Sequence, residues 1–140
     1  ADGIVLFNRF YEPDIDIDKL SFTAADIFSI PNDIRHSLRW VGMLSGRINL
    51  TDISASTGIH DGKAVIKHLL AGAKTTQICS VLYQSGFDVI EQMLEELTTW
   101  MNDKGFDSID DFRGKMNYSK IKSPAVYERT QFMKYFSSID

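Results

Sequence analysis

The apolar residues of this chain follow two patterns, one typical of β-strands and one typical of α-helices. Three short apolar or β-prone runs predict strands at residues 4–7, 50–55 and 75–79. Between and after these runs, apolar residues recur at helical spacing, which predicts amphipathic helices. We expect these helices at residues 31–45, 61–72, 81–84, 90–104 and 108–111, with a terminal helix from Pro124 onwards. Strands that alternate with helices favour an α/β fold with parallel strands and right-handed crossovers.

Residues 10–30 interrupt this order. The segment contains Pro13 and several aspartates, and acidic and apolar residues alternate over positions 14–18. Alternation of this kind is typical of half-exposed β structure, so we expect a short antiparallel strand pair here. The spaced aspartates suggest calcium ligands, but the glycine and the distal glutamate of an EF-hand loop are missing. We therefore interpret them as solvated carboxylates and expect no metal site.

The first strand leads directly to two polar residues. Residues 4–7 are continuously apolar, which is typical of a strand that is covered on both faces. Asn8 and Arg9 follow at its C-terminal end, where barrel enzymes place groups that contact the ligand. The chain begins almost at this strand and has no starting methionine, so we expect it to be a C-terminal piece of a larger protein.

The second and third strands both end in small residues. The second is followed by Ser56-Thr57-Gly58 and the third by Cys79-Ser80. In a (β/α) barrel, the loops after the last two strands often form a phosphate cradle. Small residues let backbone N–H groups approach an anion, and a helix N-terminus adds a favourable partial charge. The spacing therefore predicts a phosphorylated ligand, such as a nucleotide or a flavin.

The composition narrows the class of protein. The chain has 140 residues, which is enough for one domain, and its 44% apolar and 24% charged residues are typical of globular proteins. The net charge of −4 and the absence of a basic run argue against nucleic-acid binding. A single cysteine excludes an internal disulfide and favours a reducing cytoplasm. No apolar run reaches the length of a membrane span, so we expect no membrane partner.

Five stretches carry a resemblance to a known family. They are residues 5–8, 56–59, 68–73, 76–80 and 105–115. Together and in this order, over about residues 3–116, they resemble the C-terminal part of dihydroorotate dehydrogenase, in the class 1 group and its dihydroorotate dehydrogenase-like relatives. The resemblance implies an FMN-dependent (β/α)8 barrel that oxidises dihydroorotate to orotate in pyrimidine biosynthesis. Its cofactor is FMN, and its partner is a small-molecule substrate.

The resemblance also implies roles for individual residues. The family holds the FMN phosphate through backbone N–H groups after strands seven and eight, and the corresponding cofactor-binding residues here are Thr57, Gly58, Cys79 and Ser80. Asn8 stands where the family has an asparagine that contacts the orotate ring, and Arg9 stands where class 1 usually has serine. Both are expected to bind substrate.

The chain departs from the family at several positions. Thr57 and Cys79 replace glycines, and a position that needs φ > 0 is strained without glycine. Residues 28–31 replace the glycine-rich stretch that touches the flavin. The family's catalytic base and its flavin-contacting lysine lie on earlier segments. We therefore expect no catalytic residue in this chain and no activity from the chain alone.

Other side chains have simpler interpretations. Cys79 is expected to be a small buried residue and not a nucleophile. Ser56, His60 and Asp61 lie too close together in one loop for a catalytic triad, although His60 is a candidate ligand neighbour. His36 and His68 lie in helical stretches and are expected to be partly exposed. The apolar stripe of the long helix over residues 90–101 is expected to be core.

The expected fold class is thus α/β: the C-terminal third of a (β/α)8 TIM barrel, with about three parallel strands, flanking helices and a helical tail. A complete barrel needs about 250 residues. Residues 1–118 would form the partial barrel and residues 119–140 the C-terminal extension. Two rival functions remain: another phosphate-binding barrel enzyme, such as an isomerase or aldolase, or a non-catalytic partial barrel. Three strands leave an open edge, which predicts a homo-oligomer.

Overall fold

The computed structural model describes residues 1–9, 12–24 and 26–129. The expected terminal helix falls mainly beyond these ranges. Only its first turn, α5 (Ala125–Glu128), is described, and the tail aromatics Phe132, Tyr135 and Phe136 lie outside the described residues. The remaining helical elements are η1 (Pro31–Asp33), α1 (Ile34–Ser45), α2 (Gly62–Ala71), α3 (Ser80–Ser85), α4 (Asp88–Lys104) and η2 (Ile109–Asp111).

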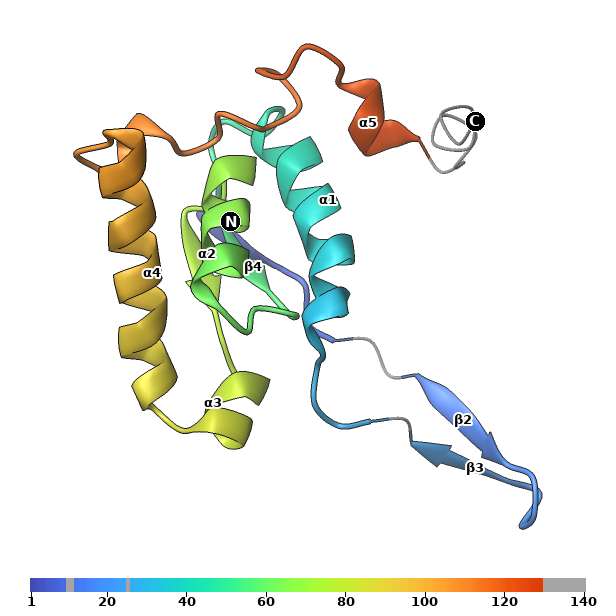
Figure 1. Ribbon diagram of the computed structural model, residues 1–140. Coiled ribbons are helices and arrows are strands. Elements are labelled where there is room, and N and C mark those ends of the chain that lie inside the picture. Colours follow the sequence, from blue (N-terminus) through green and yellow to red (C-terminus); the bar gives the residue numbers. More distant parts are fainter. Residues whose placement is uncertain (10–11, 25, 130–140) are drawn as a thin grey trace, which may run out of the picture.

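The described residues form one three-stranded parallel sheet, which confirms the prediction. Its strands are β1 (Gly3–Leu6), β4 (Asp52–Ser56) and β5 (Thr75–Gln77), in the order β1-β4-β5. Gly3 pairs with Asp52, and Ser56 pairs with Gln77. Helices α1, α2 and α4 lie side by side on one face of this sheet (Figure 1). The fold class is therefore α/β, with helices that cross over between parallel strands.

Coverage on one face corrects the expectation that the first strand is buried on both. Leu6 is buried, whereas Val5 is 49% exposed. Successive side chains of a strand point to opposite faces of the sheet. The side chains on the face away from the helices, such as Val5, are therefore not covered by any described element. The second strand is also shorter than expected. It begins at Asp52, and Leu50 lies in the preceding turn with 93% of its surface exposed.

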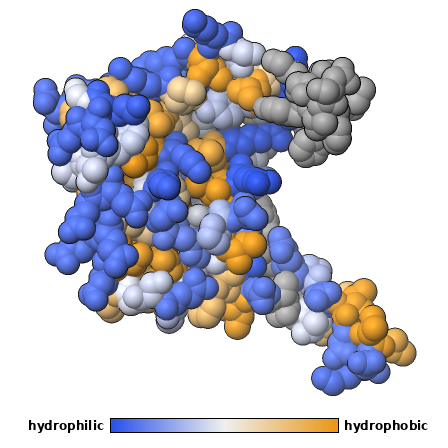
Figure 2. Space-filling model, viewed as in Figure 1, coloured by the Kyte–Doolittle hydropathy of each residue, from blue (hydrophilic) through white to orange (hydrophobic). Residues whose placement is uncertain are grey.

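A hairpin extends away from the helices and the sheet. It consists of β2 (Pro13–Asp16) and β3 (Ser21–Ala24), which pair antiparallel as expected. Figure 1 shows it projecting from the region that precedes α1, and Figure 2 shows apolar surface at its tip. Its exposed apolar side chains are Ile15, Ile17, Leu20 and Phe22.

Local sequence signals explain the helix ends. Asp61 caps α2, and its carboxylate accepts a hydrogen bond from Ala64 N at 2.7 Å. Gly72 ends the same helix with φ 110°, a conformation that favours glycine. Helix α1 ends at Gly46, and α4 ends at Gly105 in the left-handed conformation. These ends agree with the predicted boundaries.

The core lies between the sheet and the helix layer. Val41, Ile53 and Ala55 are almost fully buried there. A second cluster joins Phe112 to α2 and α4, where its ring packs against Trp100 with centroids 5.0 Å apart. The apolar stripe of α4 is only partly core, which corrects the expectation for residues 90–101. Its buried members are Met93 and Leu97, whereas Ile90 is 41% exposed and Leu94 56% exposed. Within the described residues, no helix has the length and apolar character that crossing a membrane requires.

Candidate functional site

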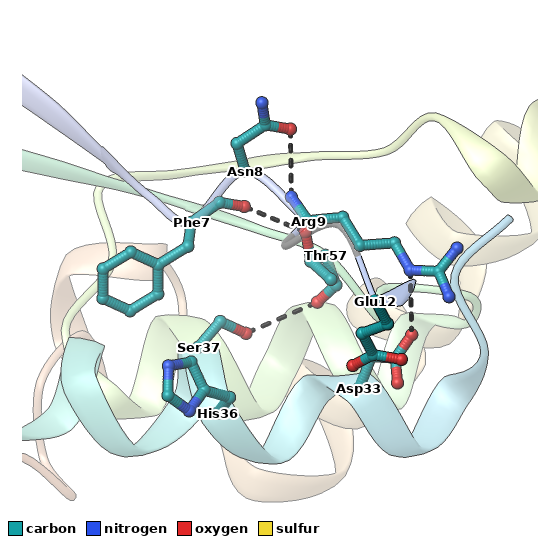
Figure 3. Close-up of a pocket in the computed structure, with 8 residues that line it drawn as sticks. All are labelled: Phe7, Asn8, Arg9, Glu12, Asp33, His36, Ser37 and Thr57. Carbon is teal, nitrogen blue, oxygen red and sulfur yellow. Dashed lines mark hydrogen bonds and ion pairs between the residues drawn. The ribbon is translucent and has the colours of Figure 1, made fainter. Parts of the chain in front are cut away.

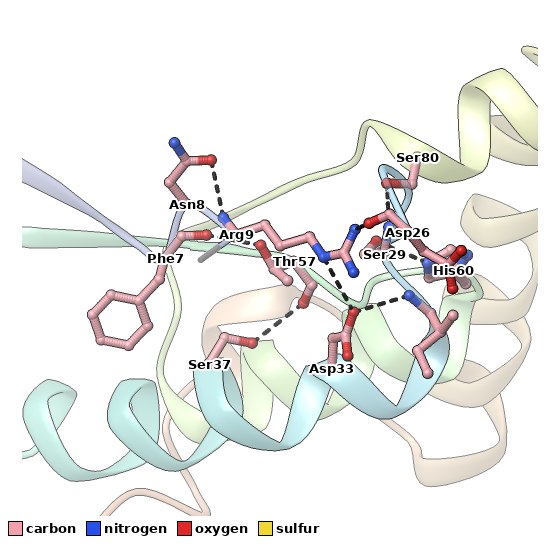
Figure 4. Close-up of polar contacts among 11 residues, drawn as sticks. Phe7, Asn8, Arg9, Asp26, Ser29, Asp33, Ser37, Thr57, His60 and Ser80 are labelled. Carbon is pink, nitrogen blue, oxygen red and sulfur yellow. Dashed lines mark hydrogen bonds and ion pairs between the residues drawn. The ribbon is translucent and has the colours of Figure 1, made fainter. Parts of the chain in front are cut away.

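The C-terminal ends of the three parallel strands meet at one edge of the sheet. Parallel neighbours end at the same edge, so the segments that follow β1, β4 and β5 come together there. These segments are residues 7–9, 57–60 and 78–80. Residues 26–33, which lead from the hairpin into α1, also reach this edge (Figure 4). We call this region the strand-end site.

The Thr57–Gly58 turn has an unusual backbone. Thr57 has φ 79° and Gly58 has φ 77°. A Cβ atom on Gly58 would lie 2.1 Å from the backbone N of Ile34, so glycine is required by space as well as by conformation. Thr57 tolerates its strained conformation while its hydroxyl donates a hydrogen bond to the Phe7 carbonyl at 2.9 Å. The turn is thereby tied to the end of β1.

A buried pair of side chains lies directly behind this turn. Ser37 on α1 is 2% exposed and His68 on α2 is fully buried. The Ser37 hydroxyl lies 3.0 Å from Nε2 of His68 and 3.4 Å from the Thr57 carbonyl oxygen. Desolvation by burial lowers the pKa of His68 to about 4. The expectation that His68 is partly exposed is therefore wrong, because α2 directs this side chain between the helices. His36 is exposed, in line with its expectation.

The Cys79–Ser80 turn after β5 is connected through Ser29 to the loop after β4. The Ser80 hydroxyl accepts a hydrogen bond from Ser29 N at 2.9 Å, and the Ser29 hydroxyl lies 3.1 Å from Nε2 of His60. Ser29 is 7% exposed, so it fills the space between the two loops. Cys79 is exposed, which corrects the expectation of burial: it precedes α3 at the outer strand β5, where no described element covers it.

Asn8 and Arg9 extend from the end of β1 (Figure 3). The Asn8 side-chain oxygen accepts a hydrogen bond from Arg9 N at 2.9 Å. The Arg9 guanidinium donates a hydrogen bond to the Asp26 carbonyl and lies 3.9 Å from the Asp33 carboxylate. Asp33 in turn accepts a hydrogen bond from Ile30 N at 3.0 Å. Arg9 therefore holds residues 26–33 against the strand-end site.

A cavity of about 220 Å³ opens between the end of β1 and the first turns of α1 (Figure 3). Its lining residues are Phe7, Asn8, Arg9, Glu12, Asp33, His36, Ser37 and Thr57. The structure thus brings the predicted residues Asn8, Arg9 and Thr57 into one cavity. Gly58, Cys79 and Ser80 do not line it, although Ser80 is connected to the same edge through Ser29.

Sequence reasoning missed Ser29, Ser37 and Asp33. Ser37 had a usable signal, because it lies at helical spacing from the apolar residues Ile34 and Val41, within the buried stripe of α1. Ser29 had no comparable signal, since its position depends on contacts with Ser80, 51 residues later.

The donor groups fit an anion better than a metal. Among the described residues, no three His, Cys, Asp or Glu side chains are grouped so that they could hold a metal ion. The backbone N–H groups of Gly58 and Cys79 have no hydrogen-bond acceptor among the residues that the structure describes. Free N–H groups at the ends of two adjacent parallel strands are the donors that a phosphate group accepts from.

Comparison with known proteins gives partial matches of one kind. No family model matches the chain. A putative dihydroorotate dehydrogenase A (fumarate) from Streptococcus pyogenes serotype M3 is 41% identical over 66 residues, which are 47% of this chain and 21% of that protein. A dihydroorotate dehydrogenase (fumarate) from Saccharomyces bayanus is 43% identical over 65 residues, 46% of this chain and 21% of its own. The matched region thus spans about a fifth of the length of these curated relatives.

Solved structures agree with the sequence matches. The ligand-free DHODH of Eimeria tenella superposes with a TM-score of 0.53 and 25% identity, covering 61% of this chain and 24% of that one. The DHODH of the same organism in complex with ferulenol gives a TM-score of 0.62 at 22% identity, covering 81% and 30%. The chain is therefore similar to part of a dihydroorotate dehydrogenase, and its fold is that of a partial (β/α)8 barrel.

Proposed function

We propose that this chain carries the cofactor-phosphate edge of an FMN-dependent oxidoreductase of the dihydroorotate dehydrogenase type. One observation carries the proposal: two turns of small residues follow the neighbouring parallel strands β4 and β5, in a chain similar to these enzymes. Neighbouring loops at the C-terminal ends of barrel strands are the usual place for a phosphate. The proposal places the enzyme in the cytoplasm.

The backbone of the two turns would hold the phosphate. Gly58 and Cys79 would donate their free N–H groups, while Thr57 and Ser80 would fix the two turns through their hydroxyls. Donors that are already oriented need little reorganisation when the ligand binds. Cys79 would act through its backbone, so its exposed thiol has no part in this step.

The end of β1 would contact the substrate. Asn8 is exposed at the mouth of the cavity, where its amide nitrogen can donate to a carbonyl of a dihydroorotate-like ring. Arg9 would attract the substrate carboxylate. Its ion pair with Asp33 partly neutralises the guanidinium and so weakens this attraction. Bound FMN would supply the two-electron oxidation. The proton-accepting base would come from outside this chain.

Flavin retention tests the proposal. The 140-residue chain, and a form lengthened on its N-terminal side to the length of the curated relatives, are incubated with FMN or riboflavin and passed through gel filtration. We expect the long form to retain FMN and to lose riboflavin, which lacks the phosphate. Retention by neither form would remove the flavin assignment and leave an unspecified phosphate-binding barrel. Ser80→Ala should weaken retention, whereas Ser85→Ala, exposed at the far end of α3, should not.

A second proposal concerns assembly. The exposed apolar side chains of Val5 and Leu94, on either side of the sheet, support self-association of this chain. Sedimentation velocity over a hundredfold concentration range is expected to show a rising sedimentation coefficient. A constant monomer value would contradict the proposal.

The division of the chain is also a proposal. Residues 1–118 form the partial barrel, and residues 119–140 form an extension. The described part of the extension supports this division, since it packs on the outer side of α1. Arg39 donates to the Tyr127 carbonyl at 2.6 Å, and Arg47 pairs with Glu128 at 3.1 Å.

A further inference from the structure

The Ser37 hydroxyl lies where several acceptors compete for one hydrogen. Within the described residues, its oxygen is 3.1 Å from the Ile34 carbonyl, 3.4 Å from the Thr57 carbonyl and 3.0 Å from Nε2 of His68. A serine hydroxyl has a single hydrogen to donate. Ser37 is 2% exposed, so water does not relieve the competition. The position of this one hydrogen therefore decides which of the three acceptors forms a hydrogen bond with Ser37.

The tautomer of His68 follows from its other nitrogen. Nδ1 lies 3.0 Å from the Ala64 carbonyl, which can only accept, so Nδ1 carries the hydrogen. The imidazole is fully buried, and its pKa of about 4 keeps it neutral near pH 7. Nε2 is then a bare acceptor that faces the Ser37 hydroxyl. The Ile34 carbonyl remains a third acceptor for this hydrogen, 3.1 Å away, and it stays in place in every variant described below.

We propose that Ser37 and His68 are positioning residues for the Thr57–Gly58 turn, and that they act by sharing the Ser37 hydrogen between Nε2 of His68 and the Thr57 carbonyl oxygen. The Thr57 carbonyl and the Gly58 N–H belong to one planar peptide unit. Any force that fixes the carbonyl also fixes the direction of the N–H on the opposite side. A side chain on α2 thereby controls the orientation of a donor at the strand-end site.

The role of this hydrogen sharing in ligand binding rests on the proposed function, in which the Gly58 N–H donates to a phosphate. The hydrogen sharing itself needs no ligand. The two statements can therefore be tested separately, one by spectroscopy on the free chain and the other by affinity for flavins.

The first experiment measures the ¹³C shift of the Thr57 carbonyl and the ¹⁵N shift of the Gly58 amide by NMR. Ser37→Ala removes the hydrogen and should move the carbonyl signal upfield. His68→Leu removes the competing acceptor, so the hydrogen moves to Thr57 and the signal should shift downfield. His68→Gln keeps an acceptor in place and should restore a value near that of the unmodified chain. Shifts in the same direction for Ser37→Ala and His68→Leu, or no shift in either, would overturn the proposal.

A matched control comes from the same pair of helices. Ser45 on α1 donates to the Ala71 carbonyl of α2 but does not contact the turn. Ser45→Ala therefore weakens the α1–α2 contact to a similar degree and should leave the Thr57 carbonyl signal unchanged. If it moves this signal as much as Ser37→Ala does, a general loosening of the helices explains the shifts and the proposal fails.

The second experiment compares FMN and riboflavin affinities in the lengthened form. Ser37→Ala should weaken FMN binding about fivefold, the size expected for one hydrogen bond, and leave riboflavin unchanged. Equal weakening for both flavins would overturn the link to the phosphate. Absence of FMN binding by the unmodified long form would instead refute the proposed function, and the NMR shifts would still decide the hydrogen sharing.

Discussion

Acid should destabilise the fold through His68 in particular. This imidazole is fully buried and its pKa is lowered to about 4, chiefly by desolvation, from the 6.5 of an exposed histidine. In the unfolded chain the same group takes up a proton near pH 6.5. The unfolded state therefore binds more protons between these two values, and stability is lost as the pH falls through that window.

The size of the effect follows from the two pKa values. Each tenfold difference in proton affinity is worth about 1.4 kcal/mol, so the full loss is about 3 kcal/mol below pH 4. At pH 5 the unfolded imidazole is almost fully protonated and the folded one is mostly neutral, which gives a loss of about 2 kcal/mol. That is a large share of the stability of an ordinary domain.

Urea unfolding followed by circular dichroism at pH 7.5 and pH 5.0 measures this loss. His68→Gln is the matched variant, because its amide can donate to the Ala64 carbonyl and accept from Ser37 without titrating. All other titrating groups are shared, so the unmodified chain should lose about 2 kcal/mol more than the variant between the two pH values. Equal losses in the two chains would show that His68 is protonated as easily in the folded state as in the unfolded state.

Three further substitutions have expected outcomes. Gly58→Ala should cost more than about 3 kcal/mol and lower the thermal midpoint, because its Cβ would lie 2.1 Å from the backbone N of Ile34 at φ 77°; an unchanged midpoint would contradict this. Gly42→Ala should displace the Tyr127 ring, which lies within 2.5 Å of the new Cβ, and speed proteolysis after residue 119 without melting α1. Phe112→Ala should cost about 3 to 5 kcal/mol in urea, because the ring is fully buried, and a loss under 1 kcal/mol would refute its core role.

Local signals and long-range contacts were predicted with different success. Asp61, Gly72 and Gly105 mark helix ends through their own conformational preferences, and all three ends were found from the sequence. Burial depends on what lies opposite in space. His68 was expected at the surface and is fully buried, whereas Leu94 was expected in the core and is 56% exposed.

The residues of the candidate site show the same difference between local signals and long-range contacts. The resemblance to a family and the strand order placed Thr57 and Asn8 at one edge, and the structure brings them into one cavity. The contact between Ser29 and Ser80 could not be predicted, because it joins positions 51 residues apart through a segment without a periodic pattern. The exposure of Cys79 also follows from its place beside the outer strand, which small-residue composition does not reveal.

The pairing of β1 with β4 has a consequence for synthesis on the ribosome. Gly3 and Asp52 are partners in the sheet, and they stand 49 residues apart in the chain. At about 5 to 20 residues per second, β1 leaves the ribosome roughly 3 to 10 s before its partner strand does. During that interval its backbone donors and apolar side chains have no β4 to pair with, so nascent chains halted between these strands should be bound by chaperones more strongly than chains halted after β4.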